Sequence, residues 1–322
     1  MTNDNPQVPW TDEQWARVNK VVQEEANRAR MAATFLPLLG PLPGDTDFVR
    51  QEVIQYQGPP PGWAAPPPPI PPPIILGIQD RPVIQLATLQ VRVPVRGAQM
   101  ADPEMTSVLA LFRRAANVLA RLEDAVVFRG LAADLAFPPG QNRFAPPPNV
   151  GPPPPQRVWE ITGGQVSRGL WANPGQFPLA PQVNIAVLPP VNRDTRLVYG
   201  IAQAIGLLEA QGQFGPFAVV LDQELFLVAQ TPTAALVLPQ DRILPFLGGG
   251  PLLRSSTLNG PPGVAYGVVV ALGGEPVELV IATDVCVQFL QVTAEPLFVF
   301  RVCEKMALRI KEPEAIVQLV ML

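Results

Sequence analysis

Apolar side chains near the N-terminus recur at the spacing of a helix. Thr11, with Gln14 three residues later, has the pattern of a capping box that starts a helix. The apolar positions that follow share one helical face: Trp15, Val18, Val22, Ala26, Ala29 and Ala33. Prolines from Pro37 onward end this pattern after Phe35. The pattern predicts an amphipathic helix that either packs on its own core or is offered to a partner.

A second and longer helical pattern begins at Asp102. Asp102 suits the N-cap position and Pro103 suits the first helical position, and the pattern ends near Gly130. Its apolar stripe consists of Val108, Phe112, Ala115, Leu119, Leu122 and Val126. The length and the apolar face predict the main helix of a large domain.

An extended region lies between the two helices. Residues 58–73 contain ten prolines among sixteen residues, which excludes a helix or a central strand. Residues 88–96 then alternate between apolar and polar side chains, as in a strand with one covered face. This order predicts a projecting arm that needs a neighbouring subunit to cover it. The alternative is a disordered proline-rich loop.

The second half of the chain changes from helical to strand patterns. A second proline-rich stretch, 137–155, predicts an irregular surface insertion. A helix is expected over 195–211, a buried strand over 215–221, and short helices after Asp222 and Pro239. Four apolar stretches predict strands: 263–272, 276–283, 285–292 and 295–303. The mixture predicts an irregular α+β fold.

The composition indicates large interfaces between subunits. Hydrophobic residues make up 48% of the chain and charged residues only 16%, whereas about a quarter is usual for charged residues. The longest apolar runs fall short of the roughly 18 residues that a membrane span needs, and the polar start of the chain does not resemble a signal peptide. We therefore expect a cytoplasmic protein with no membrane partner, which buries its apolar surface against other subunits.

The charge and the motifs argue against catalysis and against nucleic acid as a partner. The net charge is −4 without a basic block, and affinity for nucleic acid depends on neutralised phosphates. The chain has no His, which excludes His-based catalysis and His metal ligands. Glu123 and Asp124 are adjacent in the second helix and point about 100° apart, so they predict a salt bridge or a surface face. No catalytic residue, metal site or cofactor is expected.

The two cysteines, Cys286 and Cys303, both lie in apolar stretches with a strand pattern. Such positions favour buried free thiols. A reactive or bridging pair is the alternative.

Six short segments occur in a fixed order over nearly the whole chain. They are WTDEQW at 10–15, GPPPGWAA at 58–65, LEDAVVFRG at 122–130, FGPFAVVL at 214–221, EPLFVFRV at 295–302 and PEA at 313–315. Together they resemble segments of the encapsulin shell proteins of the family 1 type, a linocin-like family. The chain departs from that family in proline-rich insertions at 66–73 and 137–181 and in additional residues between Cys303 and Pro313.

The resemblance implies the α+β fold of tailed-phage major capsid proteins. That fold has a peripheral domain, an axial domain and an extended arm. The corresponding division of this chain is an N-terminal helix (1–36), an arm with its proline-rich insertion (37–100), a peripheral domain (101–194), an axial domain (195–262) and a β-rich return to the peripheral domain (263–322).

The resemblance also implies a function without catalysis. Encapsulin shells are icosahedral compartments of about sixty copies or a larger multiple. They enclose a cargo enzyme, often a peroxidase or a ferritin-like protein, which docks through its C-terminal peptide. The expected partners are therefore further copies of this chain and a cargo enzyme, and no nucleic acid.

Two sets of residues are implied by family position. The cargo groove lies beside the N-terminal helix, at Trp15, Val18, Val22 and Ala26, although these side chains also suit attachment of the helix to its own domain. The five-fold pore loop falls at residues 230–241 and contains Thr231, Pro232, Thr233, Ala234 and Ala235. An uncharged ring would pass small neutral molecules better than it would select ions.

Three alternatives remain open on the sequence. A phage or prophage major capsid protein would share the fold, although only about ten residues precede the first helix, where capsid proteins commonly carry a scaffolding segment. A stand-alone enzyme or bacteriocin is disfavoured because the sequence has no His and no recognisable catalytic motif. A proline-rich adaptor would not explain the ordered helices and strands.

Overall fold

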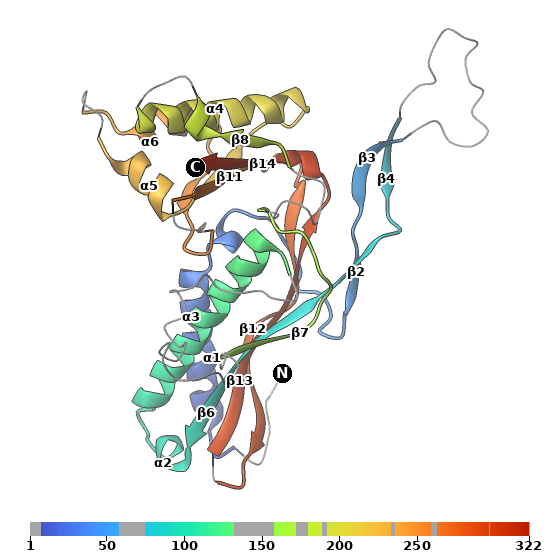
Figure 1. The fold of residues 1–322 in the computed structure, drawn as a ribbon. Helices are drawn as coiled ribbons and strands as arrows, with labels where there is room; N and C mark the ends of the chain where they lie inside the picture. The colour runs from blue at the N-terminus through green and yellow to red at the C-terminus, as the bar shows by residue number, and fades with distance from the viewer. Residues whose placement is uncertain are drawn as a thin grey trace, which may run out of the picture.

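The structure is a computed structural model of the 322-residue chain. It describes residues 8–57, 75–131, 158–171, 180–188, 192–232, 236–258, 263–295 and 297–321. Two five-stranded sheets with helices packed on them form the body, and two-stranded ribbons extend from it (Figure 1). Both proline-rich stretches and residues 233–235 of the expected pore loop lie outside the described residues.

The first sheet has the strand order β1-β12-β13-β6-β7. Its strands are β1 (Leu38–Leu39), β12 (Val277–Val292), β13 (Leu297–Ile310), β6 (Ala87–Arg96) and β7 (Trp159–Gly163). All neighbours are antiparallel except β1 and β12. Two long helices, α1 (Asp12–Ala29) and α3 (Thr106–Arg129), pack against one face, and the short α2 (Gly97–Met100) joins β6 to α3.

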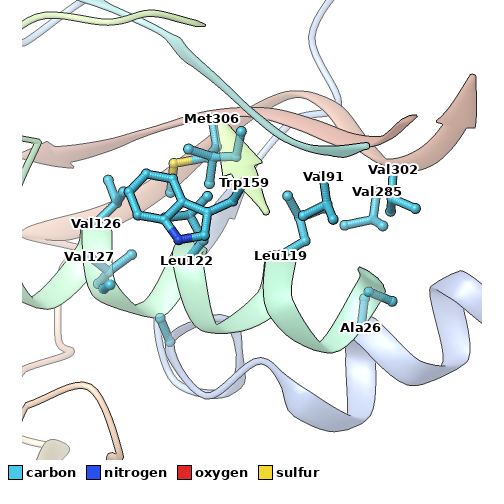
Figure 2. Packing of buried hydrophobic residues seen from close by; sticks show 14 of the residues in the cluster. Ala26, Val91, Leu119, Leu122, Val126, Val127, Trp159, Val285, Val302 and Met306 are labelled. Atoms are coloured by element: carbon cyan, nitrogen blue, oxygen red, sulfur yellow. The ribbon is translucent and has the colours of Figure 1, made fainter. Parts of the chain in front are cut away.

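The alternation of apolar residues in β6 explains how this sheet holds its helices. Leu89, Val91, Val93 and Val95 are all buried and point to the helical face. Figure 2 shows Leu119 and Leu122 of α3 pointing toward Val91 and Trp159 of the sheet, within the same buried cluster. Each fully buried side chain of this size contributes about 1.5–3 kcal/mol relative to exposure.

The second sheet has the order β10-β9-β11-β14-β8. Its strands are β10 (Leu252–Arg254), β9 (Phe217–Leu221), β11 (Ala265–Ala271), β14 (Ile316–Met321) and β8 (Gln182–Asn184). The helices α4 (Arg193–Ala210), α5 (Gln223–Gln230) and α6 (Pro239–Ile243) pack against one face of it. Short 3-10 turns lie at Ala32–Thr34, Ile185–Val187, Leu244–Leu247 and Pro313–Ala315.

Strand β9 links the two halves of the body because it is buried on both faces. Phe217, Val219 and Leu221 pack against α4, α5 and α6. Ala218 and Val220 join the core that α1 and α3 share with the first sheet. The continuous apolar run of β9 follows from this position, since a strand covered on both faces has no polar side.

The arm consists of two antiparallel ribbons. β2 (Phe48–Arg50) pairs with β5 (Val83–Gln85), and β3 (Val53–Gln57) pairs with β4 (Ile75–Gln79). The β3–β4 ribbon extends away from the body (Figure 1). The β3–β4 ribbon flanks the proline-rich stretch on both sides. The expectation that residues 88–96 also belong to a projecting arm is wrong, because β6 lies inside the first sheet and is covered by the helices of its own chain.

Three further sequence expectations differ from the structure. The second long helix begins at Thr106, because the Asp102 carboxylate accepts a hydrogen bond from the backbone N–H of Glu104 in a local turn (3.1 Å) and caps no helix. The stretches 276–283 and 285–292 form one strand, β12, with irregularities in its register. Residues 263–322 divide between the two sheets, since β11 and β14 pair in the second sheet and β12 and β13 in the first.

Candidate functional site

The four helix residues expected at the cargo groove are buried in the body. Trp15, Val18, Val22 and Ala26 belong to the core shared by α1, α3 and the first sheet. Trp15 also lies edge-on to Trp10, with ring centroids 5.1 Å apart, and Trp10 stacks on Phe300 at 4.7 Å. These side chains therefore attach α1 to its own domain, which is the other role that the sequence allowed for them.

The capping box that starts α1 is present as expected. Thr11 and Gln14 exchange hydrogen bonds between side chain and backbone, at 3.3 and 3.0 Å. The outward face of the helix is polar and exposed, and it includes Arg17, Lys20 and Glu24. Apolar side chains that are only partly covered occur at its margins, at Val21, Met31 and Ala33.

A buried charge cluster holds the chain immediately after α1. The Arg30 guanidinium is 5% exposed and faces three carboxylates: Glu123 at 3.0 Å, Asp284 at 2.8 Å and Glu304 at 3.4 Å. These carboxylates come from α3, β12 and β13 respectively. Arg30 thus ties the end of α1 to three elements that are distant in sequence.

Asp124 fixes the same segment through the backbone. Its carboxylate accepts hydrogen bonds from the backbone N–H groups of Met31 (3.1 Å) and Ala32 (2.8 Å). Glu123 and Asp124 therefore both hold the segment 30–32 that follows α1. The salt bridge expected for this pair is present, and the alternative of a surface face is wrong because both carboxylates are buried.

Burial and crowding shift the acidity of these carboxyl groups. Burial raises the pKa of Glu304 to about 7, although the charge of Arg30 opposes the shift. Burial also raises the pKa of Asp124 to about 6, against the two backbone hydrogen bonds that lower it. Burial, followed by the charge of Glu304, raises the pKa of Glu123. One cation cannot balance all of these anions, so the cluster retains a proton near neutral pH.

The loop expected at the pore connects α5 with α6. Thr231 and Pro232 are exposed at its start, and Leu236, which is 86% exposed, lies on its far side. Gln230 and Gln240 are hydrogen-bonded to each other through their side chains at the base of the loop. Thr233, Ala234 and Ala235 lie outside the described residues.

Large apolar side chains are exposed on the arm. Leu76 is 67% exposed, Ile78 65% and Phe48 57%. Further exposed apolar side chains lie on and beside the helices of the second sheet: Val187, Tyr199, Phe214, Leu227, Leu244 and Phe246. Exposed apolar surface of this extent is typical of regions that bind other proteins.

Within the described ranges, no group of three or more His, Cys, Asp or Glu side chains is placed to hold a metal ion. No helix in this part of the chain is long and apolar enough to cross a membrane. One shallow hollow of about 380 Å³ lies on the first sheet, lined by Gln90, Arg92, Val158, Trp159 and Glu160. The Arg92–Glu160 ion pair (2.9 Å) occupies the polar part of this hollow.

Sequence comparison points to shell proteins. Residues 175–307 match the family described as encapsulating protein for peroxidase. The chain is also 24% identical, over 315 residues, to the type 1 encapsulin shell protein EncA of Myxococcus xanthus (strain DK1622). That alignment covers 96% of this chain and 92% of EncA.

Structural comparison finds the same fold in capsids and shells. The virus-like particle from Pyrococcus furiosus superposes with a TM-score of 0.59 at 13% identity, covering 95% of this chain and 99% of the other. The capsid of Myoviridae phage XM1 gives 0.57 at 13% identity, covering 89% and 90%. The SrpI encapsulin of Synechococcus elongatus PCC 7942 gives 0.50 at 11% identity, covering 99% and 91%.

The sequence match and the shared architecture confirm the resemblance that the six short segments indicated. The chain resembles the encapsulin shell proteins in sequence, and it has the α+β fold found in phage capsid proteins.

Proposed function

We propose that many copies of this chain assemble into the closed shell of an encapsulin compartment, which encloses a cargo enzyme in the cytoplasm and catalyses no reaction itself. The relationship to a named encapsulin shell protein over almost the whole chain supports this function. The fold shared with a virus-like particle and a phage capsid supports a closed particle. Sixty copies are the simplest icosahedral arrangement.

The exposed arm is the observation that carries this proposal. A two-stranded ribbon is marginally stable in water, and β3–β4 exposes Leu76 and Ile78 without cover from the described part of its own chain. Burial of apolar area against a neighbouring subunit contributes roughly 25 cal/mol per Å². A closed shell repeats the same contact at every subunit, so one modest patch stabilises the whole particle.

Assembly is tested by placing charge on the arm. The double variant Leu76→Asp/Ile78→Asp should yield folded, small oligomers or single subunits, because buried unpaired carboxylates oppose the contact. The matched control, Leu76→Met/Ile78→Val, keeps both positions apolar and should form particles like those of the wild type. Size-exclusion chromatography and electron microscopy distinguish the results. Normal particles from the charged variant would refute the role of the arm.

The cargo is proposed to dock beside α1 on the inner wall through its C-terminal peptide. The name of the matching family, encapsulating protein for peroxidase, favours a peroxidase as cargo; a ferritin-like protein is the other candidate. Since Trp15, Val18, Val22 and Ala26 are buried, the groove would use the partly covered apolar side chains at the margin of the helix. An extended peptide gains affinity from apolar anchors in such a groove.

Val21 provides the test of this docking site. Val21→Asp should reduce the amount of cargo that co-purifies with intact particles, because Val21 lies at the partly covered margin of α1. Gln23→Asp places the same charge on the exposed face of the helix and should leave loading unchanged. Equal loading of the two variants would exclude Val21 from the docking groove.

The loop at 230–241 is proposed to line the five-fold opening. The described residues next to its gap, Thr231, Pro232 and Leu236, are uncharged. Such a ring favours small neutral solutes over ions. A ring of carboxylates introduced by Thr231→Glu should raise the permeability of the particle to small cations relative to anions. Unchanged permeability would exclude this loop from the opening.

A phage or prophage capsid protein is the second candidate, favoured by the fold shared with phage XM1. The two functions predict different contents. An encapsulin particle purified from its native cells should contain protein cargo and little nucleic acid, whereas a capsid should contain DNA. The ratio of absorbance at 260 nm and 280 nm, followed by nuclease treatment and mass spectrometry of the contents, separates them.

A further inference from the structure

The two cysteines of the chain are direct neighbours in the first sheet. Cys286 of β12 and Cys303 of β13 are paired across the antiparallel ladder. Their Sγ atoms lie 3.8 Å apart. Opposite residues in such a ladder have Cα atoms about 4.5–5.5 Å apart, which lies within the range of about 4.4–6.8 Å that a disulfide spans. The two strands can therefore bridge with little movement of the backbone.

An irregularity of the ladder produces this pairing. Thr283 pairs with Lys305, and the next recorded pair is Cys286 with Cys303. Three residues of β12 thus oppose two of β13, which is the signature of a β-bulge. In an unbroken ladder Val285, and not Cys286, would face Cys303. The extra residue brings the two thiols together and keeps Val285 in the core.

The two thiols differ in exposure and acidity. Cys286 is partly exposed, whereas Cys303 is buried. A hydrogen bond from Cys303 lowers the pKa of Cys286, and Gln288 and the positive charge of Arg301 act in the same direction. The Gln288 amide lies 3.7 Å from the Cys286 sulfur, and Gln288 also accepts hydrogen bonds from Arg301. The hydrogen bond to Cys286 and burial raise the pKa of Cys303.

We propose that Cys286 and Cys303 form a peroxide-sensitive dithiol that closes to a reversible cross-strand disulfide within one subunit. The thiolate of Cys286 attacks one oxygen of a hydroperoxide, the O–O bond breaks, and an alcohol and a cysteine sulfenic acid result. The sulfur of Cys303 then attacks the Cys286 sulfur, the S–S bond forms, and water leaves. In total, two thiols and one hydroperoxide give one disulfide, one alcohol and one water.

The roles of the two residues follow from their surroundings. The thiolate is the attacking species, and its formation depends on local charge and access. Cys286 has the access and the polar neighbours, so it reacts with the peroxide. Cys303 is buried, but it lies in contact with Cys286 and is therefore placed to resolve the sulfenic acid. Reduction by a dithiol reagent restores both thiols.

The test uses the full-length assembled protein treated with hydrogen peroxide, then denatured and alkylated. Untreated protein should take up two alkyl groups per chain, and treated protein none. Non-reducing electrophoresis should show single chains, and mass spectrometry should find the 286 and 303 peptides joined. Treatment with dithiothreitol should restore both alkylation sites. The bridge is refuted if both thiols remain free after treatment, if only disulfides between chains form, or if Cys286 ends as a sulfinic acid.

Single serine variants test the division of roles. In Cys303→Ser, the sulfenic acid of Cys286 lacks the resolving thiol and should accumulate. A cyclic 1,3-dione reagent then traps and labels it. In Cys286→Ser, the buried Cys303 should react about tenfold more slowly with peroxide than Cys286 does in Cys303→Ser. Equal rates, or a faster reaction of Cys303, would overturn the assignment of Cys286 as the reacting thiol.

Discussion

At the scale of single residues, Arg30 connects the end of α1 to three other elements. Its guanidinium contacts carboxylates from three elements while it is almost fully buried. A buried group of ion pairs adds little net stability compared with apolar side chains in the same positions. Removal of one partner is different, because it leaves the remaining charges buried and uncompensated. The cluster therefore determines where the end of α1 is held.

Arg30→Met should destabilise the protein by about 3–5 kcal/mol, because Glu123 and Glu304 would lose their buried cation. Arg28→Met is the matched control. Arg28 pairs with Glu25 at 2.6 Å, but its side chain is 76% exposed, so its loss should change stability by less than about 1 kcal/mol. Equilibrium urea unfolding at one subunit concentration measures both. Equal effects would contradict the anchoring role of Arg30.

The raised pKa of Glu304 predicts a dependence of stability on pH. In the folded protein this carboxyl holds its proton up to about pH 7, whereas its ordinary pKa is 4.5. The folded state therefore binds more protons between these values, and stability falls as the pH rises from about 4.5 to 7. This contribution is complete below pH 4.5 and lost above pH 7. Asp124, raised to about 6, contributes in the same direction.

Glu304→Gln tests this dependence, since the amide stays neutral at every pH. The melting temperature of the variant should fall less steeply between pH 4.5 and 7 than that of the wild type. Glu24→Gln changes an exposed carboxylate of α1 and should reproduce the slope of the wild type. A slope unchanged in Glu304→Gln would exclude Glu304 as the titrating group.

At the scale of elements, α1 depends on its cap and on one face. Thr11→Ala removes the side-chain acceptor of the capping box and should lower stability by about 1 kcal/mol. Gln23→Ala changes an exposed position in the middle of the same helix and should alter stability by less than about 0.5 kcal/mol. Thermal unfolding followed by circular dichroism compares the two variants. If the cap contributed nothing, the two variants would have equal stability.

The arm is the element whose stability depends most on its surroundings. Replacement of residues 53–79 by a short Gly–Ser linker should leave a folded body, because the described side chains of this ribbon belong to none of the buried cores. Particles should be absent, since the apolar ribbon is removed. The same linker inserted between Gly274 and Glu275, which are both exposed, serves as control and should permit assembly. Particles of normal diameter without residues 53–79 would contradict the role of the arm.

At the scale of the whole molecule, β9 lies between the two large cores of the body. Val219 packs on the helices of the second sheet, and Val220 packs on the core of the first. Separation of the two halves would expose the face of β9 that carries Ala218 and Val220. We therefore expect the body to act as one rigid block in assembly, while the arm adapts to its neighbour.

Several elements could be predicted because their signals are local. The face of α1, the stripe of α3 and the alternation in β6 are each contained within one run of residues, and the structure confirms them. The start of α3 was misplaced, since Asp102 suits a turn as well as a cap. The four candidate groove residues on α1 are buried in their own domain, because periodicity alone does not tell an inward face from a face that binds a partner.

The amino-acid sequence by itself determined the longer helices, the strands β6, β9, β11, β12 and β13, the absence of His and the resemblance to shell proteins. These depend on residue type and on spacing along the chain. Only the tertiary structure decided that Arg30 is held by Glu123, Asp284 and Glu304, that Cys286 faces Cys303, and that 263–322 divides between two sheets. The physical reason is that each of these contacts joins residues far apart in the chain. Their meeting depends on strand order and on one bulge in the ladder, which no local pattern encodes.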